Sequence, residues 1–181
     1  MNSTIMILQL AQILGIVGFI IIFLQFVTSS NIAEIIKFIS KAQLLKAHRR
    51  MGIIGFVLIL LHPIIVFIYY DQINVVSYIN QYIIYGLIAF SILVVTVLTT
   101  IFRNQLNVSA YLWKRIHRAN YLVFPIAFIH SISVGTFIQL YNTLEVLWYL
   151  MFLAYVAMVM LKLHNNLKAR YNKNYKLKRR K

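Results

Sequence analysis

Residues 48–70 read HRRMGIIGFVLILLHPIIVFIYY. From Met51 to Tyr70 this stretch carries no Lys, Arg, Asp or Glu, and it is close to the roughly 20 residues that a helix needs to cross a bilayer. Backbone polar groups in lipid must be paired within their own segment, so a helix is the expected form. The stretch therefore predicts a membrane-spanning helix with His48 just before it and His62 inside it.

Four similar apolar runs occur elsewhere in the 181-residue chain, 61% of which is hydrophobic: Ile5–Val27, Tyr82–Phe102, Ala119–Ile138 and Leu144–Leu163. We expect an all-α integral membrane protein, a bundle of five transmembrane helices in contact with the lipid bilayer. Residues 1–163 would form the membrane domain and residues 164–181 a basic cytoplasmic tail.

The connection between the first two spans is longer than the others. Asn31–Glu34 resembles a capping box, and apolar residues then recur at roughly helical spacing up to Leu45. This pattern predicts a short interfacial helix on the cytoplasmic surface. A simple helical linker explains the same pattern equally well.

The charges fix the expected orientation. All 18 Lys and Arg residues fall between the first and second spans, between the third and fourth, or from Lys162 to the C-terminus. The positive-inside rule makes that side cytoplasmic, with the N-terminus outside and the C-terminus in the cytoplasm. Membrane topology therefore accounts for the net charge of +15, and we expect no nucleic acid partner.

The absence of cysteine narrows the possible cofactors. A chain without cysteine cannot form disulfides, hold an iron–sulfur cluster, build a thiolate zinc site or attach a c-type haem covalently. Any haem must be held without a covalent bond, and histidine is the expected axial ligand.

Four histidines bracket two of the spans, His48 with His62 and His117 with His130. Separations of 14 and 13 residues correspond to roughly 20 Å along a helix. His48 can therefore face His117 at the cytoplasmic end, and His62 can face His130 deeper toward the outside. Two facing histidines supply both axial ligands of a haem, so the pattern predicts two stacked b-type haems with iron as the bound metal.

Helical phase tests this reading. On an ideal helix, 13 residues turn the second side chain roughly 140° away from the first. Pro125 lies between His117 and His130, and proline permits a kink. We expect a distortion there that restores the facing.

Zinc is the competing metal, but it favours four ligands clustered at one depth. His164 stands apart and is expected to be interfacial.

Haem propionates need partners. Near the inner haem the candidates are Arg49, Arg50, Lys114, Arg115 and Arg118, although topology explains these residues equally well. The outer haem has no nearby Lys or Arg, so its candidates are Tyr69, Tyr70, Ser131 and Gln139. Phe124 lies midway between His117 and His130, and we favour an ordinary core role for it over a place between the haems.

These segments resemble the ferric reductase-like transmembrane domain shared by ferric reductases and NADPH oxidases. The resemblance rests on HRRMG at 48–52 leading to LHP at 61–63, and on WKRIHR at 113–118 running through Tyr121 and Pro125 to His130. It covers nearly the whole chain. It implies two haem-binding helices with the ligand pairs His48–His117 and His62–His130.

The chain departs from full-length members of that family. Because no glycine-rich nucleotide fingerprint follows the last apolar run, we expect no cytoplasmic FAD or NAD(P)H module, and we expect a separate flavin reductase or a quinol to donate the electrons. In this respect the chain is similar to the haem subunit of the methionine sulfoxide reductase system.

The leading hypothesis is electron transfer to an extracytoplasmic acceptor, which can be ferric iron, oxygen or a redox protein. The alternative is a quinol-linked cytochrome b subunit that anchors a redox complex. A small transporter or structural protein would leave the paired histidines unexplained.

Overall fold

The computed structural model describes residues 2–30, 39–73 and 80–178. Within them the chain forms only helices: α1 (Asn2–Ser29), α2 (Lys41–Gln72), α3 (Gln81–Ile101), α4 (Ala110–Arg118), α5 (Asn120–Val134), α6 (Thr136–Leu140) and α7 (Asn142–Lys178). The all-α prediction is confirmed.

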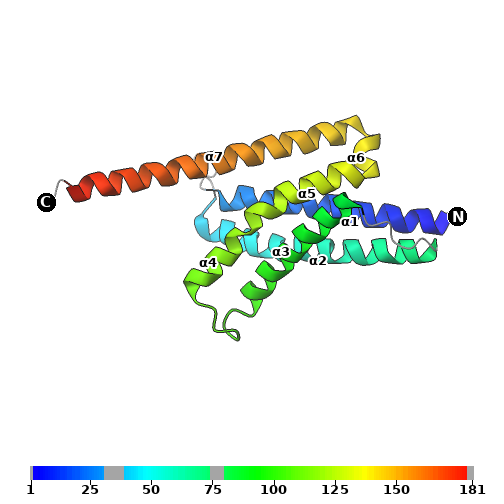
Figure 1. Cartoon of the computed structure of the whole chain (residues 1–181), viewed down its shortest axis with the longest axis horizontal. Helices are drawn as coiled ribbons and strands as arrows, with labels where there is room; N and C mark the ends of the chain where they lie inside the picture. Colours follow the sequence, from blue (N-terminus) through cyan, green and yellow to red (C-terminus); the bar gives the residue numbers. More distant parts are fainter. Residues whose placement is uncertain (1, 31–38, 74–79, 179–181) are drawn as a thin grey trace.

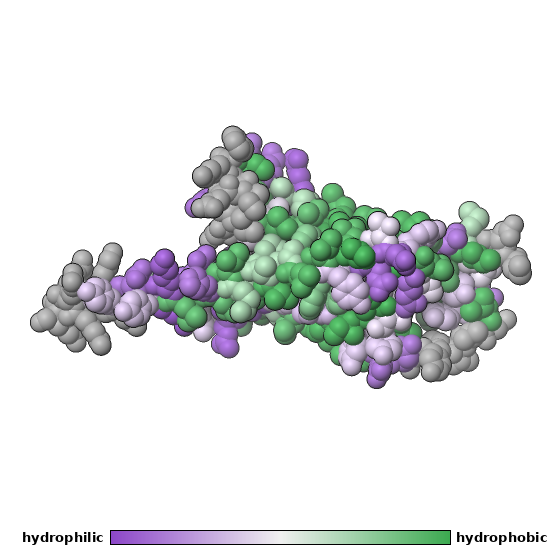
Figure 2. All heavy atoms as spheres, turned by 90° about the horizontal axis from the view of Figure 1, so that it is seen from above, coloured by the Kyte–Doolittle hydropathy of each residue, from purple (hydrophilic) through white to green (hydrophobic). Residues whose placement is uncertain are grey.

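Four of these helices, α1, α2, α3 and α7, are long and apolar enough to cross a membrane. The surface agrees, because hydrophobic residues cover the middle of the bundle and hydrophilic ones gather toward its ends (Figure 2). The expected fourth span is divided between α5 and α6. Since α5 has 15 residues, it extends about 22 Å, less than a hydrocarbon core of roughly 30 Å. Helix length thus supports four of the five expected spans.

The helices pack in two hairpins covered by α7. The most extensive contacts join α1 to α2 and α3 to α5, whereas α2 and α3 touch much less. α7 lies along α1 and α5, and its C-terminal half projects beyond the bundle (Figure 1). This 37-residue helix continues through residue 163, so the basic segment expected to follow the last span prolongs the helix as far as Lys178.

α2 begins ten residues before the apolar run does. Ser40 caps it, accepting a hydrogen bond from the backbone N–H of Gln43, whose side chain in turn bonds the backbone of Ser40. His48 therefore lies on the helix and not in the preceding loop. Residues 31–38, which hold the expected capping box and most of the expected interfacial helix, lie outside the described residues.

Stacked aromatic rings form the centre of the bundle. Phe19 of α1 stacks on Phe124 of α5, with 4.7 Å between ring centroids, and on Trp148 of α7, at 5.1 Å. Phe124 also lies 4.7 Å from Tyr155. Phe124 and Trp148 are fully buried. Phe124 is thus a core residue that joins three helices, and this core holds the two hairpins together.

Candidate functional site: two facing pairs of histidines

The bundle brings the four spaced histidines together in two pairs. His48 faces His117 with 6.2 Å between ring centroids, and His62 faces His130 at 6.4 Å. Each pair takes one ring from α2 and one from the opposite hairpin, on α4 or α5. These are the same partners that the depth argument assigned to each other.

The spacing of the rings has a chemical meaning. Metal–imidazole bonds are about 2 Å long, and each nitrogen lies about 1 Å from its ring centre, so one metal ligated from both sides separates the centroids by roughly 6 Å. Both pairs have this separation. The described residues contain no group of three or more His, Cys, Asp or Glu side chains that could hold a metal ion.

Backbone carbonyls fix the outer pair. His62 Nδ1 lies 2.7 Å from the carbonyl oxygen of Ala11, and His130 Nδ1 lies 2.8 Å from that of Tyr82. A carbonyl oxygen can only accept, so each Nδ1 must donate a hydrogen. In the neutral imidazole, each Nε2 is then left without a hydrogen, in the state that binds a metal.

A cavity of about 720 Å³ adjoins the outer pair. It is bounded by both His62 and His130 and by mostly apolar side chains from both hairpins and α7. Its volume falls within the range of small-molecule and cofactor sites. The sparse packing between α2 and α3 accounts for the space. Size, lining and free nitrogens therefore fit a flat, largely apolar cofactor such as haem.

The expected polar partners at the outer site divide into two groups. Tyr70 and Ser131 line the cavity, and Ser131 Oγ accepts a hydrogen bond from Trp148 Nε1 at 2.9 Å. Tyr69 instead packs its ring edge-on against Tyr70, and Gln139 donates to the carbonyl of Ile132 at the end of α5. Sequence reasoning missed Gln12, Asp71 and Asn80, which also border the cavity.

The inner pair has a different environment. His48 Nδ1 lies 2.9 Å from the side-chain amide of Gln25 and 3.3 Å from Thr28 Oγ1. An amide N–H donates and a hydroxyl oxygen can accept, so either nitrogen of this ring can carry the hydrogen. His117 Nδ1 is buried and has no hydrogen-bond partner among the described residues. No single proton arrangement is imposed on this pair.

Aromatic and cationic side chains cover the inner pair. The ring of Trp113 stacks on His117 at 5.3 Å, and the guanidinium of Arg103 lies 5.3 Å from the same indole ring. Trp113 Nε1 also donates to Thr100 Oγ1 at 3.0 Å, which ties α4 to α3. Sequence reasoning missed Arg103, because its role depends on the loop between α3 and α4 folding back.

The basic residues expected beside the inner haem lie on the exposed surface. Arg49 and Arg50 are exposed on α2. The guanidinium of Arg115 lies over the ring of Tyr111, and Arg118 Nε donates to the carbonyl of Lys114. His164 is exposed on α7, as an interfacial residue would be.

The helix that carries His117 and His130 is interrupted, as the phase argument required. α4 ends at Arg118 and α5 starts at Asn120, with Ala119 between them. The carbonyl of Ala119 accepts from the N–H of Leu122 in a tighter turn, at 2.8 Å. The break lies six residues before Pro125, the residue expected to cause it.

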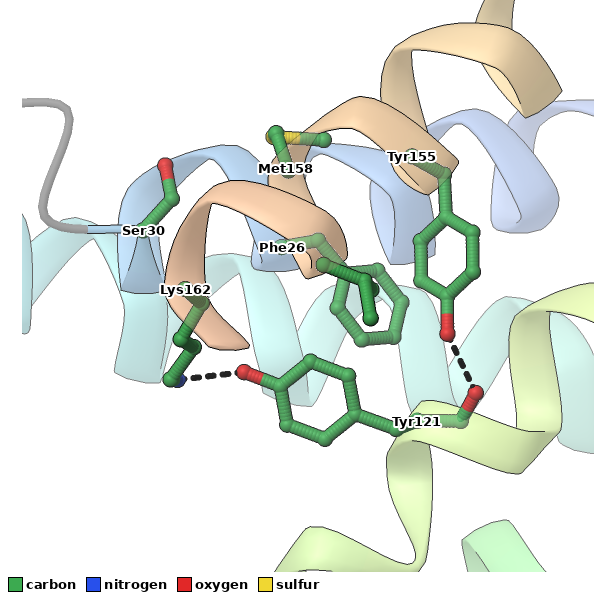
Figure 3. A pocket seen from close by; sticks show the side chains of 7 residues that line it. Phe26, Ser30, Tyr121, Tyr155, Met158 and Lys162 are labelled. Atoms are coloured by element: carbon green, nitrogen blue, oxygen red, sulfur yellow. Dashed lines mark hydrogen bonds between the residues drawn. The ribbon is translucent and has the colours of Figure 1, made fainter. Parts of the chain in front are cut away.

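Pro125 has a different consequence. Because proline has no N–H, the carbonyl of Tyr121 four residues earlier loses its helical partner. The hydroxyl of Tyr155 on α7 donates to that carbonyl at 2.5 Å, and Lys162 Nζ donates to the hydroxyl of Tyr121 (Figure 3). A proline in a helical run signals an unpaired carbonyl, but only the fold identifies Tyr155 as its partner.

Comparison with known proteins adds one match. A family model described as ferric reductase like transmembrane component matches residues 14–129, well over half of the chain. The matched region contains three of the four paired histidines and ends one residue before His130. No curated protein and no solved structure gives a significant match.

Proposed function

Because the chain belongs to the family of ferric reductase-like transmembrane components, we propose that it carries electrons across the membrane through two b-type haems. His48 and His117 would hold the inner haem, and His62 and His130 the outer one. The observation that carries the proposal is the ring separation of 6.2 and 6.4 Å, since both pairs leave room for one metal between two imidazoles.

The residues of the chain serve this role in distinct ways. His62 and His130 present Nε2 atoms free of hydrogen, since their Nδ1–H groups are bound to carbonyls. The mostly apolar cavity lining would bury the ring edges of a macrocycle. When bound, the haems would supply one-electron redox centres. The aromatic core around Phe124 fixes the spacing between the two hairpins that carry the ligands.

Five membrane crossings suit this arrangement, with the N-terminus outside and the C-terminus in the cytoplasm. The start of α1 and the end of α7 lie at opposite ends of the bundle (Figure 1), as an odd number of crossings requires. α5 and α6 together cover residues 120–140, about the 20 residues that a crossing needs. The segregation of the basic residues supports the orientation.

Electrons would enter at the inner pair and leave at the outer pair. The basic residues of α2, α4 and α7 make the cytoplasmic side electropositive, which favours an acidic donor such as a flavin reductase. A membrane quinol is the other donor class. The outer cavity lies toward the opposite side, where ferric iron, oxygen or a redox protein would accept the electrons.

The absorption spectrum of the purified protein tests the proposal. We expect reduced-minus-oxidised bands of b-type haem, with two haems per chain. His62→Ala and His130→Ala should each remove the same haem, and His48→Ala and His117→Ala the other. His164→Ala is the matched control, because that histidine is exposed and should leave both haems in place. A colourless protein after expression with ample haem would refute the proposal.

A further inference from the structure

Two glycines lie directly against the outer histidine rings. A Cβ atom added to Gly15 of α1 would meet His62 Nδ1 at 2.9 Å, and one added to Gly86 of α3 would meet His130 Nδ1 at 2.7 Å. Side-chain carbons do not approach other atoms closer than about 3 Å, because close-packed interiors leave no such overlap. Only a glycine lets each ring lie where it does.

The two contacts share one geometry. The carbonyl that accepts from His62 belongs to Ala11, four residues before Gly15, and the carbonyl that accepts from His130 belongs to Tyr82, four residues before Gly86. Residues four apart lie on the same helix face, one turn from each other. The bare glycine backbone therefore exposes the second lone pair of that carbonyl, while the first stays in the helix.

Both hairpins thus contain a glycine one helical turn after the carbonyl that accepts from the histidine ring, an arrangement that we call a glycine notch. α1 offers it to a histidine of α2, and α3 offers it to a histidine of α5. The inner pair has no counterpart among the described residues, because His48 meets an amide and a hydroxyl and His117 Nδ1 meets no partner. An arrangement that both outer histidines share, and that the inner pair lacks among the described residues, indicates a role specific to the outer site.

We propose that Gly15 and Gly86 are positioning residues that hold the hydrogen of His62 and His130 on Nδ1, and so reserve both Nε2 atoms for one outer haem. The haem in this statement rests on the proposed function, but the hydrogen position does not. A ligand histidine that donates through Nδ1 is more basic and stabilises oxidised iron. Loss of a notch should weaken outer haem binding about 10–100-fold and raise its reduction potential.

The first experiment needs no haem. The full chain, labelled with 15N-histidine and kept haem-free in lipid nanodiscs, reports by NMR which ring nitrogen carries the hydrogen. We expect the Nδ1–H form at His62 and His130, assigned with His62→Gln and His130→Gln. Gly15→Ala should change the signal of His62 alone, and Gly86→Ala that of His130 alone. An Nε2–H form at either ring of the unaltered protein would overturn the inference.

The second experiment measures the affinity and potential of each haem. Gly15→Ala and Gly86→Ala should weaken the same haem and raise its midpoint potential. Gly55→Ala is the matched control: its Cβ would crowd Ile21 at 2.7 Å in the same seam between α1 and α2, but it meets no histidine. It should leave both haems unchanged.

The outcomes separate the two proposals. Two bound haems with unchanged affinity and potential in both alanine variants would refute the glycine inference and leave the proposed function standing. Failure of the unaltered protein to take up haem would refute the proposed function, and the NMR result would still decide the hydrogen position. If the alanine variants do not fold, an Nε2–H form at either ring of the unaltered protein would still overturn the inference.

Discussion

Tyr155→Phe should destabilise the protein only while Pro125 is present. The hydroxyl of Tyr155 satisfies the carbonyl of Tyr121, which Pro125 leaves without a helical partner (Figure 3). Phenylalanine keeps the ring that packs on Phe26 and Phe124 and removes only this donor. In Pro125→Ala the new N–H can donate to the same carbonyl, so the hydroxyl becomes redundant.

The structure sets the size of the effect. A buried carbonyl left without a partner costs about 1–3 kcal/mol. Hydrogen bonds between membrane helices average about 0.6 kcal/mol and reach about 1.7 kcal/mol. A small cavity of about 10 Å³ adjoins Tyr121 and Tyr155, so loss of the hydroxyl would make room for one water that partly replaces it. We therefore expect a loss of about 1 kcal/mol with Pro125 and close to zero with Ala at that position.

The assay is a double-mutant cycle. The free energy of unfolding is measured for the unaltered chain, Tyr155→Phe, Pro125→Ala and the double variant, by reversible unfolding in mixed micelles followed by circular dichroism. Tyr149→Phe is the control, because Tyr149 lies on the same helix and is 49% exposed. Equal losses from Tyr155→Phe in both backgrounds would show that the carbonyl of Tyr121 does not depend on this hydroxyl, and the reasoning would fail.

Three further predictions concern contacts that hold the site in place. Thr96→Val should lower the free energy of unfolding by about 1–2 kcal/mol in the same assay, since it leaves Asn120 Oδ1 at the start of α5 without its 2.7 Å donor; a neutral effect would contradict this. Ser40→Ala should cost about 1 kcal/mol and speed hydrogen exchange in the first turn of α2, whereas unchanged exchange would argue against the cap. Trp148→Phe should lower the free energy of unfolding by about 1–3 kcal/mol, because it removes the buried donor to Ser131, and it should shift the fluorescence of the remaining tryptophan little. Full stability in this variant would show that the bond contributes nothing.

The histidine pairing could be predicted because it depends on distance along the chain. Separations of 14 and 13 residues place the second histidine of each helix at the same depth whatever the rotation of the helices. The rotation of the side chains about the helix axis could not be predicted in this way, and the sequence indicated only that the helix carrying His117 and His130 must be distorted. Pro125 was the visible candidate, but the break formed at Ala119, where no residue type marks it.

The surroundings of the histidines could not be read in the same way. Arg115 and Arg118 were candidates for the propionates of the inner haem, although topology explained them equally well, and in the structure their guanidinium groups contact Tyr111 and a backbone carbonyl. A long charged side chain can reach many partners from one backbone position, so its sequence position does not determine its contact. Arg103 and Trp113 cover His117 because the loop between α3 and α4 folds back, and no periodicity reveals that fold.

The sequence by itself determined that this is a helical membrane protein, that its basic residues are segregated between and after the apolar runs, and which histidines share a depth. Those properties follow from hydrophobic length, charge segregation and the fixed rise of a helix, all of which are local. Only the tertiary structure decided that His62 and His130 rest on Gly15 and Gly86 and donate to carbonyls one turn away. Those contacts depend on how neighbouring helices are rotated, and rotation is set by packing across the whole bundle.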